Sequence, residues 1–364
     1  MSRRPGAGAL AGIAMILLLA APAAAARMPE PPRGAFDVPR PSAPLGDVVF
    51  GRQSLAAARI SATASSQRYP IRSGDGAATV TVNVTAACSV TCDAADPQAI
   101  ARFMGTLIHG AEIDLVTVQM ETPDQLAYDC GFGAQACYYS GENRIVISGD
   151  SAPGPDGATR DFVLAHEYGH HVAQHRRMPA PFSSAIDWGT ERWASHENVC
   201  LGRRHGTYFP GDEGDHYTED PGEAFAESFA FNRFPNAHLK WEYAPSLKPT
   251  ARSFAMVRRD VLSPWRRRQA VHFAGRLPSF GHPTAVRNVA TPLDGRVSAR
   301  LTGPGAGGFD LILRNRKGRR LRASSGVGSG QAVSITACGQ HALKAAIRRV
   351  HPSRGEFRLV VRRP

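Results

Sequence analysis

The stretch from Asp161 to His171 constrains this chain more than any other, because it contains the pattern His-Glu-x-x-His. On a helix, residues four apart lie on one face, so His166 and His170 can offer two imidazole nitrogens to one zinc ion. Glu167 can then reach a water held on that metal and act as a general base. The alternative is a surface helix with a chance pattern. The apolar residues at 162–164 argue against it, because buried helices rarely carry three such polar groups without a function.

The N-terminal region has the features of an exported protein. Residues 1–26 combine a basic start, a short apolar run and a small-residue site, and are typical of a secretory signal peptide. The apolar run is too short to span a bilayer comfortably, so we expect no transmembrane anchor. Residues 27–75 are expected to be a proline-rich leader or linker. The sequence therefore predicts a secreted, extracellular protein.

Six cysteines fit an oxidising compartment, where an even number suggests disulfides. They are Cys88, Cys92, Cys130, Cys137, Cys200 and Cys338. The first four can form two local bridges. That leaves two that can pair only if the domains touch there, and the sequence does not fix the connectivity.

The positive charge is unevenly distributed along the chain. Residues 251–364 hold 23 Lys and Arg but 4 Asp and Glu, whereas the whole chain has a formal net charge of +12. Such a basic region can dock on an anionic cell-surface polymer. The alternative is arginine used as a solubilising surface residue. No nucleic-acid motif accompanies the charge, so nucleic acid is not an expected partner.

Between the leader and the basic region, the periodicity predicts alternating strands and helices. Strands are expected at 80–85 and 115–120, a hairpin at 130–148, and helices at 97–109, 159–175, 190–197, 220–231 and 250–262. In zinc peptidases of this plan, the edge strand just before the active-site helix binds the substrate backbone. We place that role on one strand of the hairpin. An ordinary core hairpin is the alternative.

A catalytic zinc site needs a third protein ligand. In the long motif His-Glu-x-x-His-x-x-Gly-x-x-His it is a histidine, but here the last position is Arg176. A better candidate follows at Glu223, four residues before Glu227, so that both carboxylates lie on one helix face. Glu223 is then the expected ligand, and Glu227 the acceptor for a ligand histidine N–H. The alternative is an amphipathic helix with two solvated glutamates.

The motif at residues 166–170 and the Glu-Ala-Phe-Ala-Glu at 223–227 together resemble the gluzincin metallopeptidases, most nearly their lethal-factor-type catalytic domain. The resemblance covers roughly residues 100–265. It implies a zincin-like α+β domain with an active-site helix and a small β-sheet, here placed at residues 76–278. It also implies a tyrosine, shortly before the second helix, that stabilises the transition state. Tyr217 occupies that place, and His216 beside it is a rival.

From about Pro283 the chain changes to short alternating strands, which predict a small all-β sandwich at residues 283–364. On the residues at 301–305, 309–311 and 357–361, this region resembles the bacterial pre-peptidase C-terminal domain, which is appended to secreted peptidases. The match is imperfect, because the usual Tyr-Tyr-Val-Arg-Val-like strand is replaced by the residues at 341–347.

These observations together predict a secreted zinc-dependent metalloendopeptidase that acts on protein or peptide substrates. His166, His170 and Glu223 are the expected zinc ligands, and Glu167 is the expected general base. Two other classes stay open. One is a surface-binding protein with an inactive or structural zincin domain, and the other is a zinc hydrolase of non-peptide amides.

Overall fold

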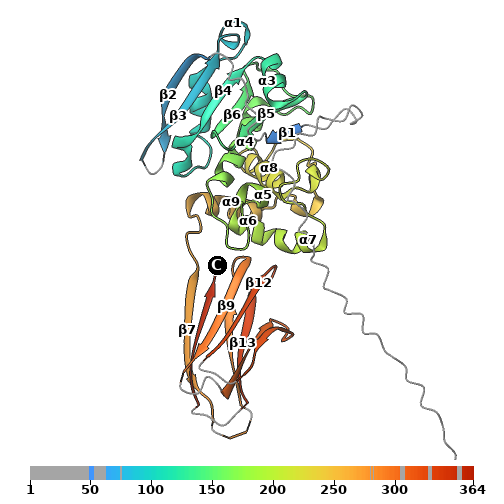
Figure 1. Cartoon of the computed structure of the whole chain (residues 1–364). Helices are drawn as coiled ribbons and strands as arrows, with labels where there is room; N and C mark the ends of the chain where they lie inside the picture. Colours follow the sequence, from blue (N-terminus) through green and yellow to red (C-terminus); the bar gives the residue numbers. More distant parts are fainter. Residues whose placement is uncertain are drawn as a thin grey trace, which may run out of the picture.

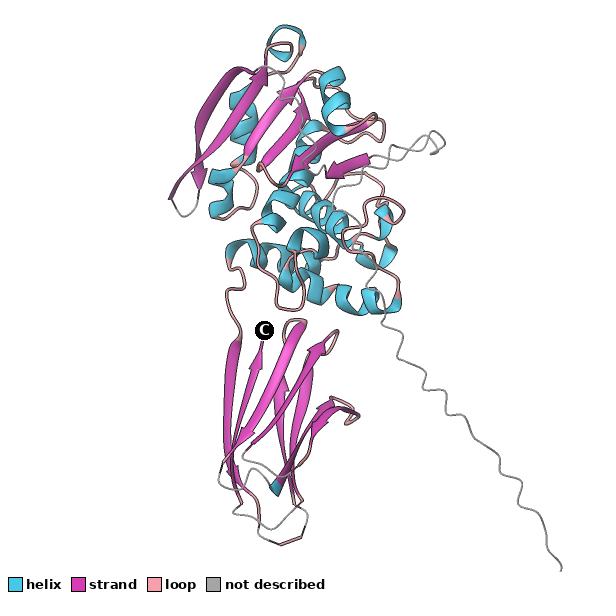
Figure 2. Ribbon diagram, viewed as in Figure 1, coloured by secondary structure: helices cyan, strands magenta, loops and turns pink. Residues whose placement is uncertain are grey.

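The computed structural model describes residues 49–52, 63–73, 76–278, 280–281, 283–303, 308–326, 330–350 and 355–364. The expected signal peptide and most of the expected leader lie outside these residues. The described part of the chain forms a mixed helix–sheet body followed by a body built from strands (Figure 1, Figure 2). The α+β class and the C-terminal all-β region are therefore as predicted.

The first body is organised on a six-stranded sheet with the order β1-β5-β6-β4-β3-β2. The strands are β1 (Val49–Arg52), β2 (Thr63–Ser73), β3 (Gly76–Thr85), β4 (Thr117–Glu121), β5 (Ala134–Tyr139) and β6 (Arg144–Ser148). β3, β4 and β6 run parallel, whereas β5 is antiparallel to β6. The β5–β6 pair is the predicted hairpin.

The helices of this body form two groups: those up to residue 174 cover the two faces of the sheet, and those after it pack on the helix at 160–174 and on one another (Figure 1). They are α1 (Cys88–Thr91), α2 (Pro97–Met104), α3 (Pro123–Cys130), α4 (Arg160–Gln174), α5 (Ala185–Trp188), α6 (Glu191–His196), α7 (Val199–His205), α8 (Pro221–Arg233) and α9 (Ala251–Leu262), with the 3-10 helices Ala111–Leu115, Tyr217–Glu219 and Pro245–Leu247. Alternation along β6 explains the layers, because successive side chains point to opposite faces. Ile145 and Ile147 join the core that contains α4, while Val146 packs in a smaller cluster with Leu126 of α3.

The N-terminal boundary of this body differs from the predicted one at residue 76. β2 lies inside the expected leader, yet it pairs along its length with β3, and β1 pairs with β5. β2 contains Pro70 and its described side chains are mostly exposed, as suits an edge strand. Because β2 contains a proline and few buried residues, its composition resembles that of a linker.

The second body is a sandwich of two four-stranded antiparallel sheets, with the orders β12-β9-β14-β7 and β11-β10-β13-β8. Its strands are β7 (Gln269–Arg276), β8 (Thr284–Ala290), β9 (Gly295–Thr302), β10 (Phe309–Asn315), β11 (Arg320–Ser324), β12 (Gly330–Ala337), β13 (Ala342–Arg349) and β14 (Glu356–Arg363). β7 pairs with β14, so the sandwich begins before the predicted residue 283. Its core is separate from that of the first body.

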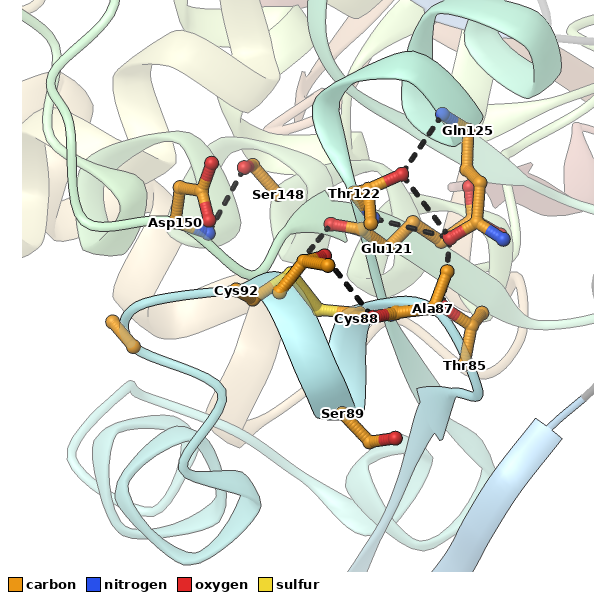
Figure 3. The surroundings of a disulfide bond; sticks show 12 residues. Thr85, Ala87, Cys88, Ser89, Cys92, Glu121, Thr122, Gln125, Ser148 and Asp150 are labelled. Carbon is orange, nitrogen blue, oxygen red and sulfur yellow. Dashed lines mark hydrogen bonds between the residues drawn. A yellow bond between two sulfur atoms is a disulfide. The ribbon is translucent and has the colours of Figure 1, made fainter.

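Three disulfides join the six cysteines, and two of them are local. Cys88–Cys92 and Cys130–Cys137 close short loops. The first lies beside the start of α3 (Figure 3), where the Thr85 hydroxyl donates to Gln125 Oε1 at 2.7 Å. The first bridge joins the start of α1 to its C-cap residue, whereas the second fastens the end of α3 to β5.

The third disulfide, Cys200–Cys338, joins α7 to the end of β12 and so links the two bodies. Hydrogen bonds reinforce this junction. The Asp294 N–H donates to Ser195 Oγ at 2.9 Å, and Arg204 donates to the Thr336 carbonyl at 3.1 Å.

In the part of the chain that the structure describes, no helix is both long enough and apolar enough to cross a membrane.

Candidate metal centre

Helix α4 carries the His-Glu-x-x-His pattern through the middle of the first body. It begins after Thr159, whose hydroxyl caps the helix by accepting from the Phe162 N–H. His166, Glu167 and His170 are each at most 1% exposed. Residues 162–173 are all buried, so this is not a surface helix with a chance pattern.

Helix α8 brings the two glutamates to the same place. Asp220 caps it through the Gly222 N–H at 2.8 Å, and Pro221 occupies the first turn. Phe225 packs edge-on against Trp193 and fixes the apolar side of the helix. The opposite side faces α4, and Glu223 there is fully buried. The glutamates of α8 are therefore not solvated.

Three donor atoms form a small triangle between α4 and α8. His166 Nε2 and His170 Nε2 are 3.2 Å apart, and each is 3.4 Å from Glu223 Oε2. Ligands of a tetrahedral zinc ion at about 2.0–2.2 Å lie about 3.3–3.6 Å from one another. A charge-assisted hydrogen bond is shorter, at about 2.7–2.9 Å. The donor set and its spacing therefore fit a zinc ion better than direct hydrogen bonding.

Glu227 orients the first histidine. Its Oε2 lies 2.9 Å from His166 Nδ1, so Nδ1–H donates to the carboxylate, and a metal ion would take the place of the proton on Nε2. Burial acts to lower the pKa of His166, but the carboxylates of Glu223 and Glu227 outweigh it and raise this pKa to about 10. The local field thus strongly favours a positive charge between the helices.

Tyr217 lies at the triangle and His216 does not. The Tyr217 hydroxyl donates to Glu223 Oε2 at 3.2 Å and is 3.1 Å from the Tyr243 hydroxyl. Burial, with the Glu223 charge adding to it, raises the pKa of Tyr217 well above its ordinary value, so the phenol stays protonated. The ring of His216 stacks on Phe209 instead, and its Nδ1 bonds Asp212 at 2.8 Å.

Tyr243 is a site residue that sequence reasoning missed. It is 5% exposed and lies in the connection between α8 and α9, where no periodicity marks it. Its ring contacts those of Tyr217 and Trp241. In the sequence, the short aromatic run Trp-Glu-Tyr at 241–243 is a weak indication that this connection contributes to the site.

The remaining polar groups at the end of α4 have structural partners. His171 is held between the Tyr138 hydroxyl at 3.0 Å and the Glu112 carbonyl at 2.8 Å. Arg176, which stands where the longer motif has a histidine, pairs with the Glu112 carboxylate and donates to the Asp260 carbonyl at the end of α9. These contacts fasten α4 to its neighbours.

A second group of carboxylates also shares Glu223. Glu213, Asp220 and Glu223 have oxygen atoms within 4.8 Å of one another. One Asp220 oxygen is already used as the cap of α8. Zinc prefers sites with imidazole donors, so the triangle with two histidines is the better zinc site.

The hairpin strands are not the edges of the described sheet. β6 lies between β5 and β4, and the outer side of β5 is paired in parallel with β1, from Val49 with Ala134 to Arg52 with Tyr138, with one register shift between Val49 and Gly51. β1 has four residues within a stretch expected to be leader, which is too short for periodicity to reveal. The outer edge of β5 therefore accepts a further strand, but in this structure that strand is β1.

Comparisons with known proteins leave the family open. No family model matches the sequence, and no curated protein matches it. One solved structure that matches is the pre-peptidase C-terminal domain of a collagenase from Bacillus anthracis, with 15% identity over 25% of this chain and 87% of that domain, at a TM-score of 0.22. With so low a score the likeness carries no argument, and the β-sandwich rests on its own strand pairing.

Proposed function

We propose that this chain is a secreted zinc metallopeptidase of the gluzincin kind. The observation that carries the proposal is the triangle of His166 Nε2, His170 Nε2 and Glu223 Oε2, with sides of 3.2–3.4 Å. These residues would hold the zinc ion, with Glu227 orienting His166. When bound, zinc supplies a Lewis acid and lowers the pKa of the water it holds to about 7.

The protein's own groups then carry the proton and the developing charge. Glu167, on the same helix as both histidines and 1% exposed, takes a proton from the attacking water and delivers it to the leaving amine. The protonated Tyr217 hydroxyl, which now donates to Glu223, turns to donate to the oxyanion. Tyr243 supports Tyr217 through the hydroxyl contact of 3.1 Å.

An extended peptide suits the surroundings of this centre. β5 is antiparallel to β6 and packs against α4, the helix that carries both proposed histidine ligands and Glu167. The pairing with β1 supports strand addition at the outer edge of β5, since a substrate backbone can use the same hydrogen-bonding groups. A substrate would have to displace the β1 segment.

Export and the C-terminal module complete the proposal. Three disulfides support an oxidising destination, as does the signal-peptide pattern of residues 1–26. The position of the sandwich after the helix–sheet body supports a module of the pre-peptidase C-terminal type.

The test measures zinc content and casein digestion for the purified wild type and for Glu167→Gln. We expect about one zinc ion per chain in both proteins, proteolysis that a chelator abolishes, and a fall in kcat of about 10²–10⁴ in the variant. Glu356→Gln is the matched control, because it makes the same change at an exposed position of the sandwich. It should behave as the wild type.

Each other outcome contradicts a named part of the proposal. A wild type without zinc would remove the metal centre. Zinc binding without cleavage of casein or of a peptide library would exclude a general peptidase. Full activity in Glu167→Gln would assign the proton transfer to another group.

A further inference from the structure

A row of arginines crosses the outer face of the sandwich sheet formed by β12, β9, β14 and β7. β9 contributes Arg296 and Arg300, and β14 contributes Arg358 and Arg362, all four exposed. In the antiparallel register Arg362 lies opposite Ser298 and Arg358 opposite Thr302. Directly opposed residues share a face, as do residues two apart on one strand. The four side chains therefore project from one face.

The register turns these four arginines into a line. Read along the ladder, the order is Arg296, Arg362, Arg300 and Arg358, alternating between β9 and β14. Each step is two residues along the strand, or about 7 Å, so the line extends about 20 Å. Arg268 adds a fifth cation at the first end, where it donates to the Arg296 carbonyl and to Ser298 Oγ.

Small side chains flank the line on both sides and leave the guanidinium groups accessible. On β12 these are Ala332 and Ser334, opposite Arg300 and Ser298, and on β7 they are Ala270 and Ala274, opposite Arg362 and Arg358. The larger His272 lies between the two alanines, opposite Val360 rather than opposite an arginine. A hollow of about 420 Å³ lies on this face. It is lined by Ser298, Arg300, Ala332, Ser334, Val360 and Arg362 among others.

Negative charge is sparse around the line. Within the described residues, these arginines make no ion pair within 4 Å, unlike Arg348 on the other sheet, which pairs with Asp310. Glu356 on β14 lies directly opposite Arg276, beyond the Arg358 end of the line. Five guanidinium groups close together repel one another, an arrangement that a bound polyanion relieves.

We propose that this face binds a linear acidic polysaccharide. A line of cations with regular spacing matches a chain that carries carboxylate or sulfate groups at intervals, and the planar fork of arginine pairs well with such anions. The hydroxyls of Ser298 and Ser334 beside the line can bond to sugar oxygens. The polymer would lie along the β9–β14 ladder, with one acidic group over the hollow between Arg300 and Arg362.

Two other polyanions fit this face less well. Single-stranded nucleic acid is generally held by several aromatic side chains that stack on its bases. The outward positions of the four strands are Arg, Ser, Thr, Ala, Gly, Val and Glu, with His272 on β7 as the one aromatic ring among them. A membrane surface is generally bound with large apolar side chains that enter the headgroup region. Here the residues between the arginines are small.

The experiment measures binding of the full-length mature protein to dextran sulfate and to polygalacturonate, with neutral dextran as the blank. A 20-nucleotide single strand and anionic phospholipid vesicles are run in parallel. We expect saturable binding to at least one acidic polysaccharide, weakened by salt, because exposed charge interactions are screened over about 8–10 Å. Arg300→Ala with Arg362→Ala should weaken it at least tenfold.

The matched control is Arg320→Ala with Arg322→Ala, which removes the same charge from exposed positions of β11 on the other sheet. It should retain most of the affinity. Ala332→Glu, which adds a carboxylate at the hollow, should weaken binding while the melting temperature stays unchanged. The proposal is overturned if neither polysaccharide binds, if the β11 pair costs as much as the β9–β14 pair, or if nucleic acid or vesicles bind more tightly through this face.

Discussion

Gly169 of α4 lies so close to Ala226 of α8 that no side chain fits between these two helices of the candidate metal centre. A Cβ atom on Gly169 would lie 2.8 Å from the Ala226 Cα and 3.2 Å from its carbonyl oxygen. Those are backbone atoms, which cannot rotate away. The glycine inside His-Glu-Tyr-Gly-His therefore allows α8 to approach until Glu223 Oε2 is 3.4 Å from both histidine nitrogens.

Gly169→Ala is the direct test of this contact. In an ordinary helix interior the change stabilises by about 1 kcal/mol, because alanine has the higher helix propensity. Here we expect the opposite sign, a loss of about 1–3 kcal/mol from overpacking, together with weaker zinc binding. Thermal or denaturant unfolding and a zinc titration measure the two effects. A stabilised variant with wild-type zinc affinity would show that the helices are not held at this contact.

The two glutamates of α8 should differ in their effect on metal binding. Glu223→Ala removes a proposed ligand and should abolish stoichiometric zinc. Glu227→Gln disturbs only the orientation of His166, through the 2.9 Å contact, and should weaken zinc binding by about 10–100-fold. Competition with a chromophoric chelator measures both.

Glu213→Gln is the control for the second carboxylate group. It should leave zinc affinity unchanged, because Glu213 belongs only to the group with Asp220 and Glu223. A large loss in Glu213→Gln, with wild-type affinity in His170→Ala, would move the metal to that second group.

Tyr217→Phe should separate catalysis from metal binding. The variant loses the donor to the oxyanion, and we expect kcat to fall by about 10²–10³ with zinc content unchanged. Tyr243→Phe removes only the supporting hydroxyl and should cost less. His216→Ala should leave kcat near the wild-type value, since His216 pairs with Asp212. Equal losses in the Tyr217 and His216 variants would contradict the assignment.

The junction between the two bodies should show a pH-dependent stability through Asp294. Burial raises the pKa of this carboxyl from 3.8 to about 6, although its bond from the Gly339 N–H opposes the shift. Between about pH 4 and pH 6 the folded state then holds a proton that the unfolded state has lost. The contribution of Asp294 to the free energy of unfolding therefore falls as pH rises through that window, and it is constant above the window.

Asp294→Asn keeps an acceptor for the Gly339 N–H and removes the buried charge. We expect the variant to be more stable than the wild type at pH 7.5, by on the order of 2–3 kcal/mol, with the difference shrinking toward pH 4. Denaturant unfolding of both proteins with disulfides intact measures this difference. A difference that stays constant from pH 4 to pH 7.5 would place the titration elsewhere.

Local pattern alone predicted the helices that carry the candidate site and which of their residues share a face. The spacing of His166 and His170 depends only on helix periodicity, and the same holds for Glu223 and Glu227. The N-cap residues Thr159 and Asp220 are local signals too, and the structure begins both helices after them. The hairpin and the all-β C-terminal region follow from strand alternation in the same way.

Features that require contacts between residues far apart in the sequence were decided only by the tertiary structure. The 3.4 Å contacts of Glu223 with both histidines require α4 and α8 to cross at Gly169, and no periodicity encodes a crossing point. The same holds for β2, whose partner is chosen by non-local pairing, and for Tyr243, which lies in an irregular connection. The line of arginines exists only in the register of β9 with β14, because residues about 60 apart in sequence alternate there across a ladder. Sequence periodicity determines which face a residue occupies within its own element, whereas packing between elements determines which faces meet.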